Sequence, residues 1–407
     1  MKSFKTYYLV LILSFLTAMA LVGGFNFLVD PEQVFAFKEI RGFNDQKRHI
    51  PPLRTHFSTQ LLHGKYDAII LGSSTVQTMQ PGHPAFKGHS VLLLPIDGTN
   101  MLELYQVFEF ALKHQKLSIV VIGLDFHSFF NFRTVSADFE DSFFSERNPL
   151  LIKFSYLFSY SIVKESYKRI KESRRQYRED QNPATSPENQ PAPVRDERTP
   201  FIQSLVKGFM QIPLTADGYG EDRIVLLKQM MDDCQKNDIQ LEVYVSPVHA
   251  LRMESIFMIG LWPTYERWLR DLVRITEESN RMNPGKPPIQ LWDFSGYNSV
   301  TLVDLPARDK PLVKMQWWID FVHMNEDLAN IMIDVMRDYQ EPGRPRPPDF
   351  GMVLTSQNIE SHLAQMREGH KQYQAARPEE VMELEKIALK CKRFRVPGQP
   401  LILKFQH

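Results

Sequence analysis

The chain is poor in cysteine and carries no net charge. Only Cys234 and Cys391 occur among its 407 residues, and 48 lysine and arginine residues balance 48 aspartate and glutamate residues. Two cysteines exclude a disulfide framework, although one bridge between them stays open. No group of cysteines and histidines has zinc-site spacing, so we expect neither a metal nor a cofactor. Without a basic excess, nucleic acid is not an expected partner.

Long apolar runs are also scarce, with one exception near the N-terminus. Residues 7–29 carry no charge, and about 20 such residues suffice for a membrane-spanning helix. Lys2 and Lys5 precede the run and favour the cytoplasmic side for this end. A cleaved signal peptide is the alternative, because Ala18-Met19-Ala20 resembles a cleavage site, but the run continues through Phe27. We therefore predict a single-pass protein of the inner or plasma membrane with a periplasmic or extracytoplasmic domain.

Composition divides the sequence into four parts. A membrane anchor at 1–30 is followed by an irregular connector at 31–62, an α/β domain at 63–340 and a partly helical extension at 341–407. Within the α/β domain, residues from about 165 to 200 are rich in Pro, Gln, Glu and Arg. Such a segment buries too little apolar surface to offset its loss of conformational entropy, so we expect a disordered insertion there.

Short apolar runs alternate with helical patterns in the α/β domain. The expected strands are 66–71, 90–96, 118–125, 241–247 and 289–294, and the expected helices are 101–113, 223–237, 262–276 and 327–339. Runs this apolar are typical of strands that are buried on both faces. Their alternation with helices predicts an α/β fold with an open parallel sheet covered on both sides.

Polar residues follow each expected strand, where open parallel sheets bind their ligands. The candidate substrate contacts or walls of a site at this edge are Ser73, Asn100, Asp125, His249 and Asp293. Two of them have an alternative structural reading. His249 can be a core histidine satisfied by the backbone, and Asp293 can be an aspartate that forms a turn.

Two short segments supply the parts of a hydrolytic site. "LGSSTVQ" follows the first strand, and "WWIDFVHMN" precedes the last helix. A serine becomes a nucleophile only with a base in reach, and the base needs a partner that fixes its tautomer. Asp320 and His323 are three positions apart, so within a turn the carboxylate can accept a hydrogen bond from the imidazole. Ser74, His323 and Asp320 are therefore a candidate triad, although a strand-end serine can also simply cap a helix.

These two motifs resemble those of the SGNH/GDSL hydrolase superfamily. The resemblance covers residues 66–339. It is closest to membrane-anchored, envelope-modifying branches such as the alginate O-acetylation proteins and the teichoic acid D-alanyl transfer protein. It implies a flavodoxin-like three-layer sandwich with a parallel sheet, preceded by one transmembrane helix. It also implies Ser74 as nucleophile, His323 as base and Asp320 as its partner, with the amides of Ser74 and Gly98 as the oxyanion hole.

The resemblance further implies an activity and partners. The expected activity is that of a serine esterase or O-acyltransferase, working through an acyl-enzyme. Its expected substrate is a cell-envelope polysaccharide or another acylated glycan. A membrane-bound O-acyltransferase is the expected protein partner, and the N-terminal helix provides the contact with the membrane.

The third motif of that superfamily is altered in this chain. The superfamily often has Gly-x-Asn-Asp, whose asparagine donates to the oxyanion, whereas this chain has "GLDF" from Gly123. An ionised Asp125 cannot donate a hydrogen bond, so Asn100 or Asn131 would have to replace the missing donor. The alteration leaves open a non-catalytic SGNH-like assembly or scaffold protein that binds a glycan or a membrane acyltransferase. A phosphate-binding domain is a weaker alternative, because no lysine or glycine-rich run follows the first strand.

Overall fold

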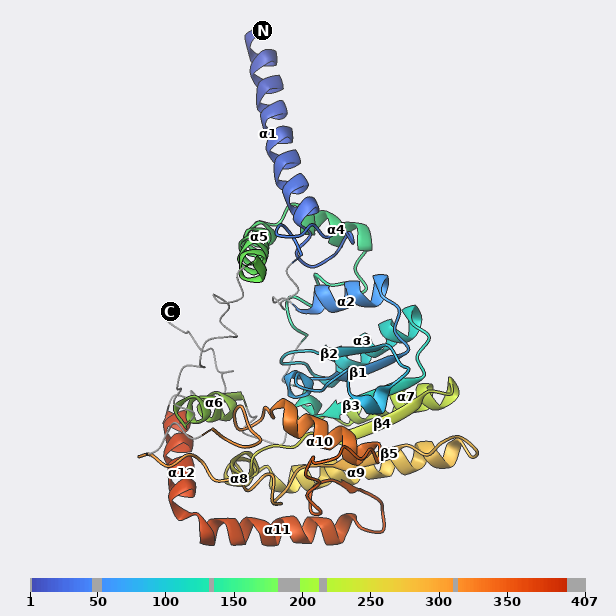
Figure 1. The fold of residues 1–407 in the computed structure, drawn as a ribbon, viewed down its shortest axis with the longest axis vertical. Coiled ribbons are helices and arrows are strands. Elements are labelled where there is room, and N and C mark those ends of the chain that lie inside the picture. The colour runs from blue at the N-terminus through green and yellow to red at the C-terminus, as the bar shows by residue number, and fades with distance from the viewer. Residues whose placement is uncertain are drawn as a thin grey trace. The chain divides into compact units, whose positions relative to one another are not determined.

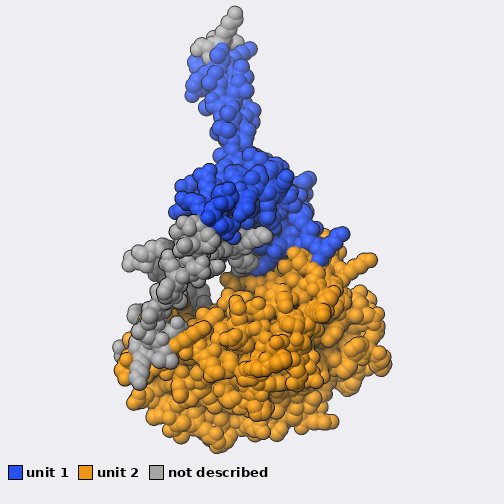
Figure 2. Space-filling view, viewed as in Figure 1, with its two compact units in different colours: residues 1–65, 136–193 blue, residues 66–135, 194–407 orange. Residues whose placement is uncertain are grey.

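The computed structural model describes residues 2–45, 53–131, 135–181, 198–211, 218–309 and 314–393. The chain forms two compact units, which Figure 2 colours separately. The smaller unit combines residues 1–65 with 136–193, and the larger unit combines residues 66–135 with 194–407.

The described part of the larger unit is built on a sheet of six strands (Figure 1). They are β1 Ala68–Gly72, β2 Val91–Pro95, β3 Ile119–Leu124, β4 Gln240–Val245, β5 Gln290–Asp293 and β6 Met352–Val353. Their order is β2-β1-β3-β4-β5-β6, and β1 to β5 run parallel, whereas β6 runs antiparallel to β5. The five predicted strands and their parallel pairing are thus confirmed. The sixth strand has two residues, too few for a periodic pattern to appear in the sequence.

Helices cover both faces of this sheet. The helices of the larger unit are α3 Met101–His114, α6 Arg198–Gln211, α7 Glu221–Lys236, α8 Ala250–Met258, α9 Trp262–Met282, α10 Glu326–Met336, α11 Ile359–Ala376 and α12 Pro378–Arg393. On one side, α3 contacts β1 and α7, and α9 contacts α7 and β5. On the other side, α10 packs in one cluster with Ile70, Val121 and Tyr244, because alternate strand residues point to opposite faces.

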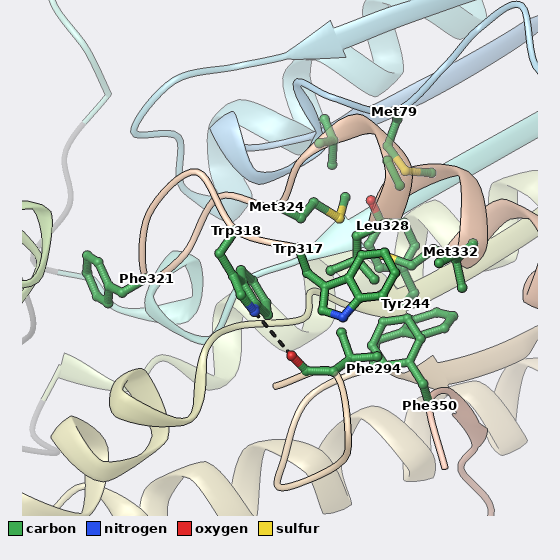
Figure 3. Packing of buried hydrophobic residues seen from close by; sticks show 14 of the residues in the cluster. Met79, Tyr244, Phe294, Trp317, Trp318, Phe321, Met324, Leu328, Met332 and Phe350 are labelled. Atoms are coloured by element: carbon green, nitrogen blue, oxygen red, sulfur yellow. Dashed lines mark hydrogen bonds between the residues drawn. The ribbon is translucent and has the colours of Figure 1, made fainter. Parts of the chain in front are cut away.

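Aromatic side chains fill the core beneath α10 (Figure 3). Trp317 and Trp318 are buried there, and the indole nitrogen of Trp318 donates to the carbonyl of Val300 at 3.2 Å. Phe321 is buried apart from them, with its ring against Gly208 of α6. Burying a large apolar side chain contributes about 1.5–3 kcal/mol. These residues belong to the segment that carries Asp320 and His323, so core packing fixes that segment in place.

The helices of the smaller unit are α1 Lys2–Val29, α2 Leu53–His63, α4 Pro149–Leu157 and α5 Tyr160–Gln181. Within α1, the stretch Phe4–Val29 is long and apolar enough to cross a membrane, by length and composition. A signal sequence fits the same description.

The prediction of a disordered insertion at about 165–200 was wrong at both of its ends. The first part is helical in α5, and α6 begins at Arg198, whereas residues 182–197 lie outside the described ones. The buried face of α5 is mostly polar, with Ser166, Arg169 and Ser173 beneath the surface. Arg169 donates to backbone carbonyls at 2.6 and 2.8 Å. Hydrogen bonds rather than apolar contacts thus hold this helix, and for that reason the hydrophobic pattern did not reveal it.

Candidate active site

Ser74 stands where β1 stops. Gly72 ends the strand, and a short 3₁₀ helix, Ser74–Val76, follows at once. The hydroxyl oxygen of Ser73 accepts from the amide of Thr75 at 3.2 Å and so caps this helix. A side chain at position 72 would collide with Val76, which explains the glycine. The chain therefore turns sharply at the carboxyl edge of the sheet and leaves Ser74 half-buried there.

Asp320 and His323 lie on a tight loop just before α10. The amide of Ile319 donates to the carbonyl of His323 at 2.8 Å, which closes the loop. One carboxylate oxygen of Asp320 accepts from the amides of Val322 and His323 at 2.9 and 2.8 Å. The other oxygen lies 2.7 Å from Nδ1 of His323. The spacing of three residues thus works as expected from the sequence, because the turn points the carboxylate at the imidazole.

The structure brings Ser74 and this pair together. Nε2 of His323 lies 2.9 Å from Oγ of Ser74, across 249 residues of sequence. With Nδ1–H donated to Asp320, Nε2 accepts the proton of the Ser74 hydroxyl. The three residues therefore form a continuous serine–histidine–aspartate relay at the carboxyl ends of the strands, with the geometry that an activated nucleophile needs.

Charge around the imidazole favours its protonated form. Burial by itself lowers the pKa of His323, but the hydrogen bond and the charge of Asp320, with the charges of Asp125 and Asp97, raise it above its ordinary value. For Asp320, burial opposes ionisation, but the hydrogen bond to His323 and the charge of His323 hold its pKa below the usual range. An imidazolium formed during a reaction would thus be stabilised at this position.

Gly98 lies on the turn that follows β2, next to the end of β1. The amide of Ile96 donates to the carbonyl of Gly72 at 2.9 Å, so the two strand ends are adjacent. Gly98 has φ +63°, and a side chain placed there would meet no heavy atom within 4 Å. Asp97, its neighbour, is close enough to act on the charge of His323. The oxyanion role of Gly98 stays a prediction, but its turn is in the expected place.

Asp125 is buried beside the nucleophile segment. Its carboxylate accepts hydrogen bonds from the hydroxyls of Ser73 and Thr75, and the Thr75 hydroxyl also lies 3.2 Å from that of Ser246. Burial raises the pKa of Asp125, although hydrogen bonds from Ser73, Ser246 and Thr75 and the charge of His323 act in the opposite direction. Asp125 therefore joins the ends of β1, β3 and β4 through one hydrogen-bond network.

His249 is a core residue and not a substrate contact. Its Nδ1 accepts from the amide of Leu251 at 3.2 Å, and its Nε2 lies 2.8 Å from the carbonyl of Val303. Burial lowers its pKa to about 4. Its ring packs edge-on against Trp318. Of the two interpretations of this histidine, the one in which backbone groups satisfy its ring nitrogens is correct. Its contact with Trp318 supports the segment that carries Asp320 and His323.

Asp293 and the two asparagines are also engaged elsewhere. Asp293 pairs with His362 of α11 at 2.7 Å. Asn100 caps α3 by accepting from two backbone amides, at 2.9 and 3.1 Å. The side-chain nitrogen of Asn131 donates to Asp222 at 3.4 Å. Asn131 is thus hydrogen-bonded to another carboxylate, and the replacement of the oxyanion donor by Asn131 or Asn100 stays a prediction.

One residue of the site went unnoticed in the sequence. The hydroxyl of Thr78 donates to the carbonyl of Met324 at 3.2 Å and connects the loop of Asp320 and His323 to the segment of Ser74. Nothing in the local pattern around Thr78 signals this contact, because its partner is 246 residues away.

The described residues contain neither a candidate metal site nor a disulfide bond. No group of three or more His, Cys, Asp or Glu side chains there is placed to hold a metal ion. Cys234 is a buried free thiol, and the side chain of Cys391 lies outside the described residues.

Comparison with known proteins identifies no relative: the chain matches no family model and no curated protein.

Proposed function

We propose that the chain is a membrane-anchored serine esterase or O-acyltransferase that acts on a cell-envelope polysaccharide. The observation that carries the proposal is the relay of Ser74, His323 and Asp320, with contacts of 2.9 and 2.7 Å. The anchor is supported by the length and composition of α1. The choice of a polysaccharide as substrate rests on the resemblance of the motifs to those of envelope-modifying SGNH proteins.

The sheet supports the same assignment. The strand order 2-1-3-4-5 is that of flavodoxin-like sheets, in which ligands bind outside the carboxyl ends of the strands. Ser74 lies at this edge, directly after β1. A flavodoxin-like sandwich of the SGNH type is therefore part of the proposal.

In the proposed reaction, Oγ of Ser74 attacks the ester carbonyl while His323 takes its proton. Asp320 stabilises the resulting imidazolium, and the amides of Ser74 and Gly98 face the oxyanion. Collapse of the tetrahedral intermediate breaks the ester bond, and the leaving alcohol takes the proton from His323. Water or a sugar hydroxyl, deprotonated by His323, then attacks the acyl-enzyme and restores Ser74.

A fluorophosphonate probe tests the proposal. We expect the folded protein to be labelled, and we expect labelling to disappear in Ser74→Ala and to fall strongly in His323→Ala. Ser118→Ala is the control, because it removes an exposed serine hydroxyl directly before β3, at the opposite edge of the sheet from the relay. Labelling that persists in Ser74→Ala would overturn the assignment.

One observation favours a second candidate, a non-catalytic scaffold that binds a glycan or a membrane acyltransferase. Asp125 occupies the position where the superfamily often carries a donor to the oxyanion, and it is engaged as an acceptor from Ser73 and Thr75. Losing one oxyanion donor costs about a hundredfold or more in rate. A folded protein that the probe leaves unlabelled and that still binds glycan would establish this second function.

A further inference from the structure

The end of α1 is held by the helix α4. The backbone of α1 approaches the ring of Phe158 so closely at Gly23 that a side chain there would come within 2.9 Å of it. Asn26 donates through its side-chain nitrogen to the carbonyl of Leu157 at 2.8 Å. These contacts lie within one compact unit, and Figure 1 shows α4 beside the lower end of α1. The C-terminal end of α4 is therefore fixed at the level of Gly23.

The exposed surface of α1 indicates how deep in a bilayer the contact between α1 and the end of α4 would lie. Apolar side chains are exposed from Phe4 to Leu21, Gly23 and Asn26 are buried, and Phe27 and Leu28 are exposed again beyond them. The stretch from Phe4 to Leu21 is about 27 Å long at about 1.5 Å per residue, close to the roughly 30 Å of a bilayer's hydrocarbon core. If α1 spans the bilayer, Gly23 lies where the acyl chains meet the headgroups, and α4 lies at the same depth.

The outer face of α4 is apolar. Leu150 is 74% exposed and Phe154 is 59% exposed, and Leu151 is exposed between them. Ile152 and Tyr156 form the opposite, buried face. Clustered apolar side chains of this size are unusual on a surface that faces water and mark a contact with lipid or protein.

The first turns of α5 continue this surface with aromatic and basic residues. Tyr160, Lys164 and Tyr167 are exposed and spaced at i, i+4 and i+7, which places them on one face of the helix. The ammonium of Lys164 lies 4.7 Å from the ring centre of Tyr160. Tyrosine and lysine side chains favour the headgroup layer of a membrane, and lysine attracts anionic lipid.

We propose that α4 and the first turns of α5 lie in the headgroup layer of the membrane that α1 spans, with Leu150, Leu151 and Phe154 inserted among the acyl chains. The inference rests on the membrane anchor of the proposed function and does not depend on the catalytic relay. Depth and composition together favour lipid over a protein partner. This second attachment would prevent the smaller unit from rotating about the axis of α1.

Site-directed spin labels on the full-length protein in lipid nanodiscs test this proposal. Cys391→Ser gives the background, since Cys234 is buried. Single labels are placed through Leu150→Cys, Phe154→Cys, Leu13→Cys in α1 and Arg175→Cys in the exposed second half of α5. The measurement compares the collision of each label with oxygen, which concentrates in the bilayer, and with a water-soluble nickel chelate.

The three regions have distinct expected results. Leu13 should favour oxygen strongly, Arg175 should favour nickel, and Leu150 and Phe154 should both lie between them on the oxygen side. Nickel-dominated values at Leu150 and Phe154, with Leu13 still in the bilayer, would overturn the inference and leave the anchor intact; a protein partner would then remain as the occupant of this face. A nickel-dominated value at Leu13 would overturn the anchor itself, and with it the inference. Neither result would bear on the proposed catalytic role of Ser74, which fluorophosphonate labelling tests separately.

Discussion

The hydroxyl of Ser73 donates to the buried carboxylate of Asp125, so a hydrogen bond to a carboxylate holds the residue next to the candidate nucleophile. The same carboxylate acts on His323 and helps to raise its pKa. Asp125 therefore influences both ends of the contact between serine and histidine.

Asp125→Asn should shift the pH dependence of the reaction. Burial lowers the pKa of His323, and Asp320 with Asp125 and Asp97 raises it, so removing one of these charges should lower it. Because the base must be neutral to accept a proton, the acidic limb of kcat/KM should then move to lower pH. Ser246→Ala is the control, since it alters the network without removing a charge, and should leave the limb in place. An unmoved limb in Asp125→Asn would show that this carboxylate does not act on the base.

Asp320→Asn should lower kcat by about 10³–10⁴-fold with little change in KM, because the imidazole loses the partner that fixes its tautomer. Steady-state kinetics on a small ester would measure this effect. Asp327→Asn, at an exposed position in the first turn of α10, should leave kcat unchanged. Equal losses in the two variants would argue for a general effect of charge and against the relay.

Gly123→Ala should destabilise the sheet beside the site. A methyl group there would come within 2.6 Å of Val76 and 2.8 Å of the Tyr244 hydroxyl, and overpacking of this kind costs about 1–3 kcal/mol. Urea unfolding would measure the loss, and activity should fall with it because Val76 belongs to the 3₁₀ helix of Ser74. Gly82→Ala, where a methyl group meets nothing within 4 Å, should be nearly neutral in both measurements. A stable, fully active Gly123→Ala protein would contradict the tight packing at this point.

The pair of His362 and Asp293 should make stability depend on pH. Burial lowers the pKa of His362, but the hydrogen bond and charge of Asp293 outweigh it, so its pKa is raised. The stabilisation is then complete below the unfolded-state pKa of about 6.5 and is lost as pH rises through the folded-state value. In urea unfolding, His362→Gln should therefore lower the free energy of unfolding by about 1–3 kcal/mol in acid and by less in base. His63→Gln, at an exposed position, is the control for the substitution itself. A deficit that is constant with pH would mean that His362 is held as a neutral residue.

Sequence reasoning predicted the sheet and the relay because both follow simple spacing rules. The end of β1 and the three-residue spacing of Asp320 and His323 are local features, and the rule for open sheets brings such ends to one edge. His249 follows a strand in the same manner as Asp125, yet only the packed structure reveals that its ring lies in the core. The polar buried face of α5 and the contact of Thr78 were not predicted for a related reason, because their hydrogen-bond partners are remote in sequence.

Ser74 and His323 are 249 positions apart in the sequence, and this separation also determines when the site can form. If the N-terminus stays in the cytoplasm, the serine crosses the membrane long before the segment that supplies its base. On the proposed topology and mechanism, the serine is an ordinary hydroxyl during export and gains reactivity only after the loop of Asp320 and His323 has docked against Thr78. If the proposed function holds, a chain that stalls before residue 323 carries no competent nucleophile and cannot attack esters in the export pathway.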